Sequence, residues 1–271
     1  MDMQSYAIKS RLQPRGADEL FAPPYLIVAA TSEREKLQDV LDEVDDRFED
    51  PANVHDTRAL SGPGHLILLF AIPSREAAGY RKFTCIARRE GLLFLDDSGL
   101  AASIVARMAR ERQWKAPGVG RALFDFLEAL LEFDEPYMQA LESRLVQLEE
   151  AVMAGKPRDL QARMGALRRE LLHLQHHYQQ LYNLGRRLYD NENDLWQKGE
   201  LALWRRFLDH VTRLSDNTQL LREQSLQLQE LFQAHVSIQQ NRTMGLLTIV
   251  TIISLPLTLV VGWYGMNFKN M

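Results

Sequence analysis

"NRTMGLLTIVTIISLPLTLVVGWYGMNFKNM", which occupies Asn241–Met271, differs in composition from everything that precedes it. Residues 243–268 contain no charged side chain, and this run exceeds the roughly 20 apolar residues that a helix needs to cross a bilayer core. A buried core helix is the alternative, but the run is too long and too uniformly apolar for a domain with a mixed surface. Trp263 and Tyr264 lie at one end, where amphipathic rings favour the membrane interface. The pattern predicts a transmembrane helix over residues 244–264.

One face of this predicted helix carries polar and small side chains. They recur every three or four positions, at Asn241, Met244, Thr248, Thr251, Leu255, Thr258 and Gly262. Polar side chains in a membrane helix turn towards other helices or towards water, because lipid offers them no hydrogen-bond partner. Periodicity alone leaves helix packing and pore lining equally open. Pore lining requires an oligomer, because one helix cannot enclose a pore.

The first 240 residues have the composition of a charged globular protein. They carry all 36 acidic side chains and 30 of the 32 basic ones, which argues against nucleic acid as a partner. Cys85 is the only cysteine, so an intrachain disulfide and a cysteine-rich zinc site are excluded. The N-terminus lacks the apolar core of a signal peptide. These features predict that residues 1–240 lie in the cytoplasm.

Residues 1–117 have the pattern of an α/β domain. Apolar, β-branched runs predict strands, and the last run predicts a hairpin that turns near Glu90; the runs are Tyr25–Thr31, His65–Pro73 and Phe83–Asp97. Helical spacing in residues 32–50 and 98–112 predicts helices beside these strands. Continuous apolar strands flanked by helices indicate a sheet that is covered on both faces.

The chain from residue 118 onwards is predicted to be all helical. Residues 118–199 predict a helical hairpin, in which Pro136 kinks or interrupts the first helix and residues 154–159 turn the chain. Residues 200–243 contain neither Gly nor Pro and predict a long stalk helix that continues into the membrane helix. Its core-facing positions follow alternating four- and three-residue steps, at Phe207, Val211, Leu214, Thr218, Leu221, Ser225, Leu228 and Phe232.

The end of the apolar run resembles the signature of the CorA-type divalent-cation transporter family. Tyr264-Gly265-Met266-Asn267 follows "LPLTLVVGW", and the spacing of the family's first membrane helix is kept at Asn241, Met244, Pro256, Leu257, Thr258, Gly262 and Tyr264. The upstream order of α/β domain, helical hairpin and stalk is also similar. The resemblance implies a funnel-shaped homopentamer with an α/β N-terminal cytoplasmic domain and a pore lined by the first membrane helix.

The resemblance also implies roles for particular residues. Gly265, Met266 and Asn267 would form the selectivity filter, within a loop at residues 265–271, and Met244 with Leu247 would form an apolar constriction. The pore-lining set, in which Thr248 and Thr251 come from the polar stripe, is Asn241, Met244, Leu247, Thr248, Thr251, Leu255 and Thr258. Mg²⁺ dehydrates reluctantly, so rings of neutral oxygens suit a hydrated ion that must bind and leave again.

The printed sequence departs from the family pattern at its end. Family members continue into a second membrane helix, which would form an outer ring around the pore, whereas this sequence stops at Met271. We expect either a fragment of a longer protein or a shortened gene product, and we favour the fragment. The polypeptide as printed is not expected to transport ions by itself.

Two further clusters could bind metal ions. His173 and His177 are four residues apart, so one helical face could offer two imidazoles to a transition metal; a solvated surface is the alternative. An acidic string could form a cation sensor between subunits or simply a solvated helical face, and comprises Asp39, Asp42, Glu43, Asp45, Asp46, Glu49 and Asp50.

No catalytic motif accompanies these features. The sequence has no P-loop, no His-Glu-x-x-His motif and no partner set for Cys85, so we predict that the protein is not an enzyme. We expect Mg²⁺ transport, with Co²⁺ or Ni²⁺ as further ions, in a plasma membrane of the bacterial inner type. No resident cofactor is expected beyond Mg²⁺ as cargo and candidate regulator. A ZntB-like zinc transporter and a membrane-anchored coiled-coil scaffold without transport remain alternatives.

Overall fold

The computed structural model describes residues 3–16, 19–41, 44, 50–74, 79–155 and 159–265, without the side chains of Asp39 and Val40. The chain divides into two compact units. The first, which we call the sheet unit, comprises Met1–Leu141 and Arg169–Leu221. The second, which we call the helical unit, comprises Glu142–Arg168 and Arg222–Met271.

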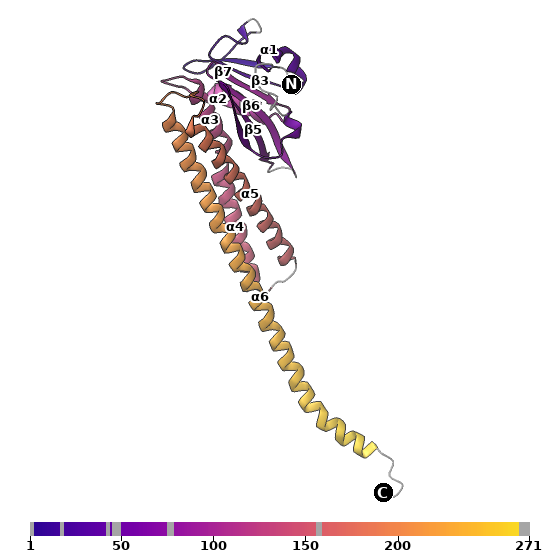
Figure 1. Ribbon diagram of the computed structural model, residues 1–271. Coiled ribbons are helices and arrows are strands. Elements are labelled where there is room, and N and C mark those ends of the chain that lie inside the picture. The colour runs from indigo at the N-terminus through magenta and orange to yellow at the C-terminus, as the bar shows by residue number, and fades with distance from the viewer. Residues whose placement is uncertain are drawn as a thin grey trace. The chain divides into compact units, whose positions relative to one another are not determined.

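The sheet unit contains a mixed seven-stranded sheet (Figure 1) with the strand order β2-β1-β3-β7-β6-β5-β4. Strands β3 and β7 pair in parallel, and every other neighbouring pair is antiparallel. The strands are β1 (Gln4–Ile8), β2 (Leu12–Pro14), β3 (Tyr25–Ala29), β4 (Arg58–Gly62), β5 (His65–Pro73), β6 (Tyr80–Arg88) and β7 (Gly91–Asp96). The three predicted strand regions are confirmed, including the hairpin that turns at Arg89 and Glu90. Strands β1, β2 and β4 were not predicted.

One face of the sheet packs against the segment that follows β3. Ile27, Ile67 and Leu93 from the sheet share a core with Leu37 and Leu41. This segment comprises a 3₁₀ helix, η2 (Thr31–Leu37), and a short helix, α1 (Gln38–Leu41). The prediction of one regular α-helix from residue 32 was therefore wrong over the described part. Leu37 ends the 3₁₀ helix and Leu41 ends α1, and both side chains still pack against the sheet.

The opposite face of the sheet is covered by two helices, α2 (Leu100–Glu111) and α3 (Val119–Leu131). Phe126 from α3 meets the sheet rings, with its ring centroid 4.5 Å from that of Phe94 and 5.8 Å from that of Phe83. The buried Asp96 carboxylate fixes the start of α2, because its oxygens accept hydrogen bonds from the backbone N–H groups of Gly99 and Ala102, at 3.0 and 3.2 Å. The prediction of a sheet covered on both faces is confirmed.

The long helices are α4 (Asp134–Met153), α5 (Leu160–Asp190) and α6 (Leu201–Gly265). A turn at Glu132 and Phe133 separates α3 from α4 just before Pro136, which agrees with the predicted kink or interruption. Helix α6 is continuous for 65 residues, which confirms the long helix. The predicted core-facing positions are buried from Phe207 to Leu228. Thr218 is tolerated among them because its hydroxyl donates a 2.8 Å hydrogen bond to the carbonyl of Leu214.

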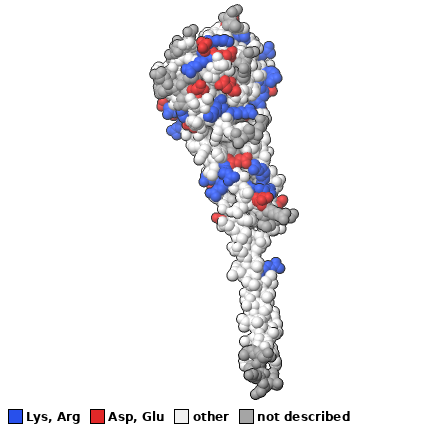
Figure 2. Space-filling model, turned by 90° about the vertical axis from the view of Figure 1, so that its right-hand side faces the viewer, with Lys and Arg blue, Asp and Glu red and all other residues white. Residues whose placement is uncertain are grey.

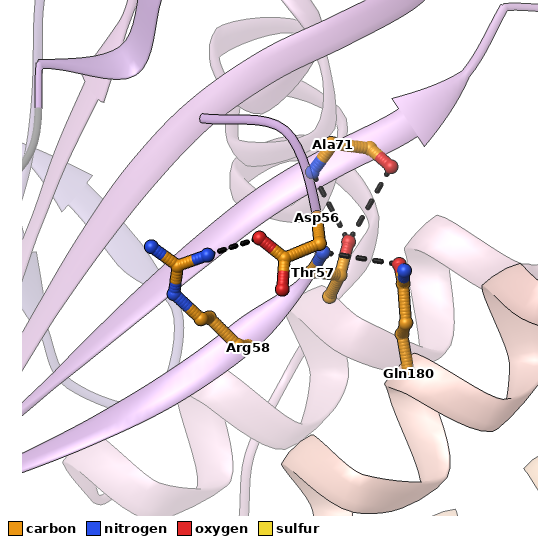
Figure 3. Close-up of polar contacts among 5 residues, drawn as sticks. All are labelled: Asp56, Thr57, Arg58, Ala71 and Gln180. Carbon is orange, nitrogen blue, oxygen red and sulfur yellow. Dashed lines mark hydrogen bonds and ion pairs between the residues drawn. The ribbon is translucent and has the colours of Figure 1, made fainter. Parts of the chain in front are cut away.

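Thr57 joins the sheet to helix α5 within the sheet unit (Figure 3). Its backbone N–H donates to Oε1 of Gln180 at 3.0 Å. Its hydroxyl accepts from the N–H of Ala71 at 3.1 Å and donates to the carbonyl of the same residue at 3.4 Å. Arg58 and Asp56 form an ion pair beside it. These contacts hold the end of β5 and the start of β4 against α5.

Burial raises the pKa of the Cys85 thiol well above its ordinary value, because the thiolate would lose its hydration. The thiolate is the nucleophile, and Cys85 is fully buried. We therefore expect Ellman's reagent to modify the native protein at least about a thousandfold more slowly than the urea-unfolded protein. The ratio of the two rates follows the unfolded fraction of the native protein, which is below about one in a thousand when the free energy of unfolding is about 5 kcal/mol or more. A Cys85→Ser variant, which has no thiol, gives the background signal. Rapid labelling of the native protein would contradict the described burial of Cys85.

Candidate functional site

The C-terminal part of α6 is uncovered. Every described residue from Ser237 to Gly265 is exposed, including large side chains such as Met244, Ile253 and Trp263. Arg242 is its only charged side chain, and Figure 2 shows the corresponding part of the surface as white with one basic group. Water-soluble surfaces rarely tolerate an apolar patch of this extent.

Helix α6 is also the one helix among the described residues that is long and apolar enough to cross a membrane. Its length and its composition alone meet the requirement for a membrane span. The apolar window within the helix is wholly unburied, unlike a core helix of a soluble protein. This segment therefore requires a cover of lipid or of other protein chains.

The polar stripe predicted from the sequence lies on one face of this segment. The helix is continuous from Asn241 to Gly262, so each residue advances the direction by about 100°. At that step, all predicted pore-lining residues and Gly262 fall within an arc of about 120°. Ile253 points in the opposite direction. The structure therefore places these residues on one face of α6.

The threonine hydroxyls of this stripe donate to the helix's own backbone. Thr248 Oγ1 donates to the carbonyl of Met244 at 2.9 Å, Thr251 Oγ1 to that of Leu247 at 2.8 Å, and Thr258 Oγ1 to that of Ser254 at 2.8 Å. Because each hydroxyl proton is used in this way, the outward side of each oxygen presents lone pairs. The face therefore presents hydrogen-bond acceptors at successive levels along the helix. Water molecules around a cation direct their protons outwards, so these acceptors match a hydrated cation.

Pro256 lies inside the apolar part of α6. It has no N–H to donate to the carbonyl of Ile252, four residues earlier, and proline inside a helix favours a bend. Figure 1 shows the C-terminal end of α6 curving. Pro256 lies off the polar stripe, so the acceptor face itself is not interrupted.

The predicted filter lies at the edge of the described chain. Gly265 is the last residue of α6. Met266 and Asn267 lie outside the described residues, as does the remainder of the predicted loop. Among the predicted acidic sensor residues, Asp42, Glu43, Asp45, Asp46 and Glu49 lie outside the described residues too.

Asp50 and Asp39 complete the acidic string. The Asp50 carboxylate caps a short 3₁₀ helix, η3 (Pro51–Asn53), by accepting the N–H of Ala52 at 2.9 Å. Asp50 therefore has a local structural contact in this chain. The Asp39 side chain is not among those described.

His173 and His177 line one cavity of about 370 Å³ in the sheet unit. The Tyr80 hydroxyl lies 3.4 Å from His173 Nδ1, and the Tyr137 hydroxyl donates to Glu170 in the same cavity. Among the described residues, no group of three or more histidine, cysteine or acidic side chains is arranged to hold a metal ion. The tyrosines could not be anticipated from the sequence, because they come from β6 and α4.

A sheet-containing domain followed by a long helix with an uncovered apolar end is the organisation of a membrane protein with a large domain outside the bilayer. A sequence profile of the family described as "CorA-like Mg2+ transporter protein" matches residues 31–271. This match covers most of the chain. The chain belongs to this family of divalent-cation transporters, which confirms the resemblance seen in the sequence.

Individual relatives agree with this assignment. The "Cobalt/magnesium transport protein CorA" of Thermotoga maritima is 28% identical over 149 residues, which are 55% of this chain and 42% of that protein. The "Putative metal ion transporter YfjQ" of Bacillus subtilis is 29% identical over 167 residues, which are 60% of this chain and 52% of that protein. The chain thus spans about half the length of these relatives.

Solved structures share the fold. The complete CorA magnesium transporter from Methanocaldococcus jannaschii matches with a TM-score of 0.80 and 17% identity, over 100% of this chain and 89% of that one. The cytoplasmic domain of ZntB from Vibrio parahaemolyticus matches with a TM-score of 0.65 and 14% identity, over 89% of this chain and 98% of that one. At these identities the likeness concerns the fold.

Proposed function

We propose that five copies of the full-length protein that contains this chain assemble around an axis and conduct Mg²⁺ across a membrane through a pore lined by the apolar part of α6. One observation carries the proposal: the stripe of internally bonded threonines on an exposed, otherwise apolar helix. Thr248, Thr251 and Thr258 present acceptors at successive levels of one face. Membership of the CorA-like family supports a divalent cation as cargo, and the fivefold assembly is what the resemblance implies.

The proposed mechanism follows from the hydration of Mg²⁺. The ion keeps several waters, and these waters donate hydrogen bonds to the hydroxyl oxygens and to the amide of Asn241. No carboxylate lies on the stripe, so nothing there holds the ion tightly enough to prevent release. Met244 and Leu247 narrow the pore with apolar side chains and stop conduction by excluding water. Gly265, Met266 and Asn267 select the hydrated ion at the other end.

The domain organisation of this proposal follows the predicted boundaries. Residues 1–117 and 118–199 form the cytoplasmic part, residues 200–243 the stalk, residues 244–264 the membrane span and residues 265–271 the filter loop. The plasma membrane, of the bacterial inner type, is the proposed location. Tilting of the long helices would couple the cytoplasmic part to the constriction.

Reconstitution of the full-length protein that contains this chain into liposomes loaded with a Mg²⁺-sensitive dye tests the function. We expect Mg²⁺ influx down its gradient, and we expect Asn267→Ala to lower this influx or its selectivity over Ca²⁺ by about tenfold, the effect of losing a hydrogen bond to a charged species. Asn270→Ala, which alters a neighbouring amide outside the motif, is the matched control. Unaltered flux and selectivity in Asn267→Ala would remove the proposed filter.

Two additional measurements separate the alternatives. Competition of Zn²⁺ and Co²⁺ with Mg²⁺ on the same liposomes decides the cargo, and Met266 favours the magnesium branch of the superfamily over the zinc branch. Mass measurement in detergent decides the assembly. A pentamer supports the channel, whereas a monomer or dimer without flux indicates a membrane-anchored scaffold.

A further inference from the structure

The loop between α5 and α6, residues 191–200, is tied to the turn between β4 and β5. The side-chain Nδ2 of Asn193 donates to the carbonyl of Gly62 at 2.8 Å and to the carbonyl of His65 at 3.0 Å. A side-chain amide nitrogen carries two hydrogens, so both donors of Asn193 are used by this one turn. The amide therefore fixes the loop to the edge of the sheet.

A second contact holds the same loop to the neighbouring hairpin. Arg89, in the turn between β6 and β7, donates from Nη2 to the carbonyl of Asp194 at 2.7 Å. Asp194 has a φ of 48°, a left-handed conformation that Asp and Asn adopt more readily than other non-glycine residues. Because Asn193 and Asp194 are adjacent, two turns of the sheet hold consecutive residues of the loop.

The loop is joined in turn to the first turns of α6, residues 201–210, which we call the root of α6. Asn191 and Trp196 form two hydrogen bonds of 3.0 Å, in which Asn191 Nδ2 donates to the Trp196 carbonyl and Asn191 Oδ1 accepts the Trp196 N–H. The ring centroids of Trp196 and Trp204 lie 5.1 Å apart, and the Trp204 side chain is 0% exposed. Phe124 of α3 meets the Trp204 ring at 6.4 Å. The root is therefore packed against both the loop and α3.

Helix α6 connects this attachment to the proposed pore. The helix is continuous from Leu201 to Gly265, so its root and the proposed constriction at Met244 and Leu247 belong to one element. A rigid helix can carry a change of tilt from one end to the other. Pro256, the proline inside α6, lies beyond the constriction in the sequence, so its bend does not separate the constriction from the root.

We propose that Asn193 is a positioning residue, which fixes the tilt of α6 and the width of the constriction by anchoring the root of the helix to the sheet. This inference rests on the proposed function, because the constriction belongs to the proposed pore. An apolar constriction conducts only when it is wide enough to hold water, so conduction rises steeply with width. A wider range of tilts therefore raises the mean flux, and loss of the anchor increases conduction.

Hydrogen exchange measured by mass spectrometry tests the anchor on the full-length protein that contains this chain, in detergent. Asn193→Asp retains the size of the side chain and removes both donors. We expect the backbone amides of the root of α6 to exchange at least about tenfold faster, the combined effect of two hydrogen bonds, while those of β6 exchange as before. Arg89→Ala acts on the same loop through a different contact and is expected to change the same amides in the same direction. Glu192→Ala, which truncates an exposed neighbour in the loop, is the matched control and should leave them unaltered.

Mg²⁺ influx into liposomes tests the effect on the constriction. Asn193→Asp is expected to raise influx at least about threefold, and Glu192→Ala to leave it unchanged. Unaltered exchange at the root in Asn193→Asp would overturn the proposal. Faster exchange with unchanged or lower influx would overturn it too, because the root would be released without effect on the constriction. Faster exchange in β6 would make Asn193 a residue that stabilises the sheet, which also contradicts a positioning role.

The two measurements distinguish a failure of this inference from a failure of the proposed function. An absence of influx with the unaltered protein would contradict the proposed function, and the exchange rates would then decide by themselves whether Asn193 anchors α6. Influx with the unaltered protein that stays the same in Asn193→Asp would leave the proposed function intact and overturn only the positioning role.

Discussion

Phe83→Ala is expected to destabilise the sheet unit by about 3–5 kcal/mol, the cost of deleting a buried ring. The Phe83 side chain is 0% exposed. Its ring stacks on Phe70 with the centroids 4.6 Å apart, and meets Phe126 edge-on at 5.8 Å. Alanine would leave a void between the sheet and α3, because both layers are fixed by their own hydrogen bonds and relax only in part. A typical domain has only 5–15 kcal/mol of stability, so this loss is large.

Urea unfolding, followed by the labelling of Cys85, measures this effect. Cys85 is two residues from Phe83 on the same strand and is reached only when the sheet opens. Phe83→Leu, which retains most of the volume, should cost less than about 1.5 kcal/mol. Tyr189→Ala, which alters an aromatic side chain that is 42% exposed, should lie within about 0.5 kcal/mol of the unaltered chain. If the two phenylalanine variants unfolded at the same urea concentration, the described aromatic core would be wrong.

The strands that could be predicted are those with a strong local signal. Strands β5, β6 and β7 are long and largely buried, so their sequences read as continuous apolar runs. Strands β2 and β4 have three and five residues, and β4 includes Arg58, Ser61 and Gly62. They pair with the strands next to them in the sequence, β1 and β5, across short turns, so the missing signal is a continuous apolar run. The strand order depends on the long-range parallel pairing of β3 with β7, which no local pattern encodes.

The polar stripe of α6 could be predicted because a helix converts spacing in the sequence into direction. Asn241 and Thr258 share a face in any uninterrupted α-helix. The structure adds what the spacing cannot give, namely that the hydroxyls of Thr248, Thr251 and Thr258 bond to the backbone and present acceptors outwards. Membership of the family was also evident from the sequence, because the motif and the apolar run lie together at residues 241–267.

The contacts that anchor α6 could not be predicted, because distant segments build them. Asn193 and Arg89 come from a loop between two helices and from a hairpin turn. In the sequence each has the pattern of an ordinary surface residue. Their proximity depends on how α5 packs against the sheet, which is set by contacts such as that of Thr57 with Gln180. Contacts formed by tertiary packing therefore require the fold.

A lysine placed at Ile253 should have a very different effect from a lysine placed at Thr251. The two residues lie near the middle of the apolar segment, on opposite faces of α6. If the stripe lines a water-filled pore, Ile253 faces lipid, where a central lysine costs about 2.5–3.5 kcal/mol of insertion free energy. That cost lowers the inserted fraction by about a hundredfold. Thr251→Lys keeps its charge in water and inserts normally, but a ring of positive charges repels Mg²⁺ and abolishes its flux.

Membrane fractionation after alkaline extraction measures insertion, and the dye-loaded liposomes measure flux. Ile253→Leu and Thr251→Ser are the matched controls; each is expected to insert and conduct, because the first stays apolar and the second retains the acceptor oxygen. If Thr251→Lys were lost from the membrane as completely as Ile253→Lys, the stripe would face lipid or another helix. Equal insertion with undiminished flux in Thr251→Lys would mean that the conducting path runs elsewhere. A hydrated axis beside Thr251 requires that Ile253→Lys fails to insert and that Thr251→Lys inserts normally but conducts no Mg²⁺. The two variants carry the same charge at nearly the same depth, so the difference would come from the direction in which each side chain points.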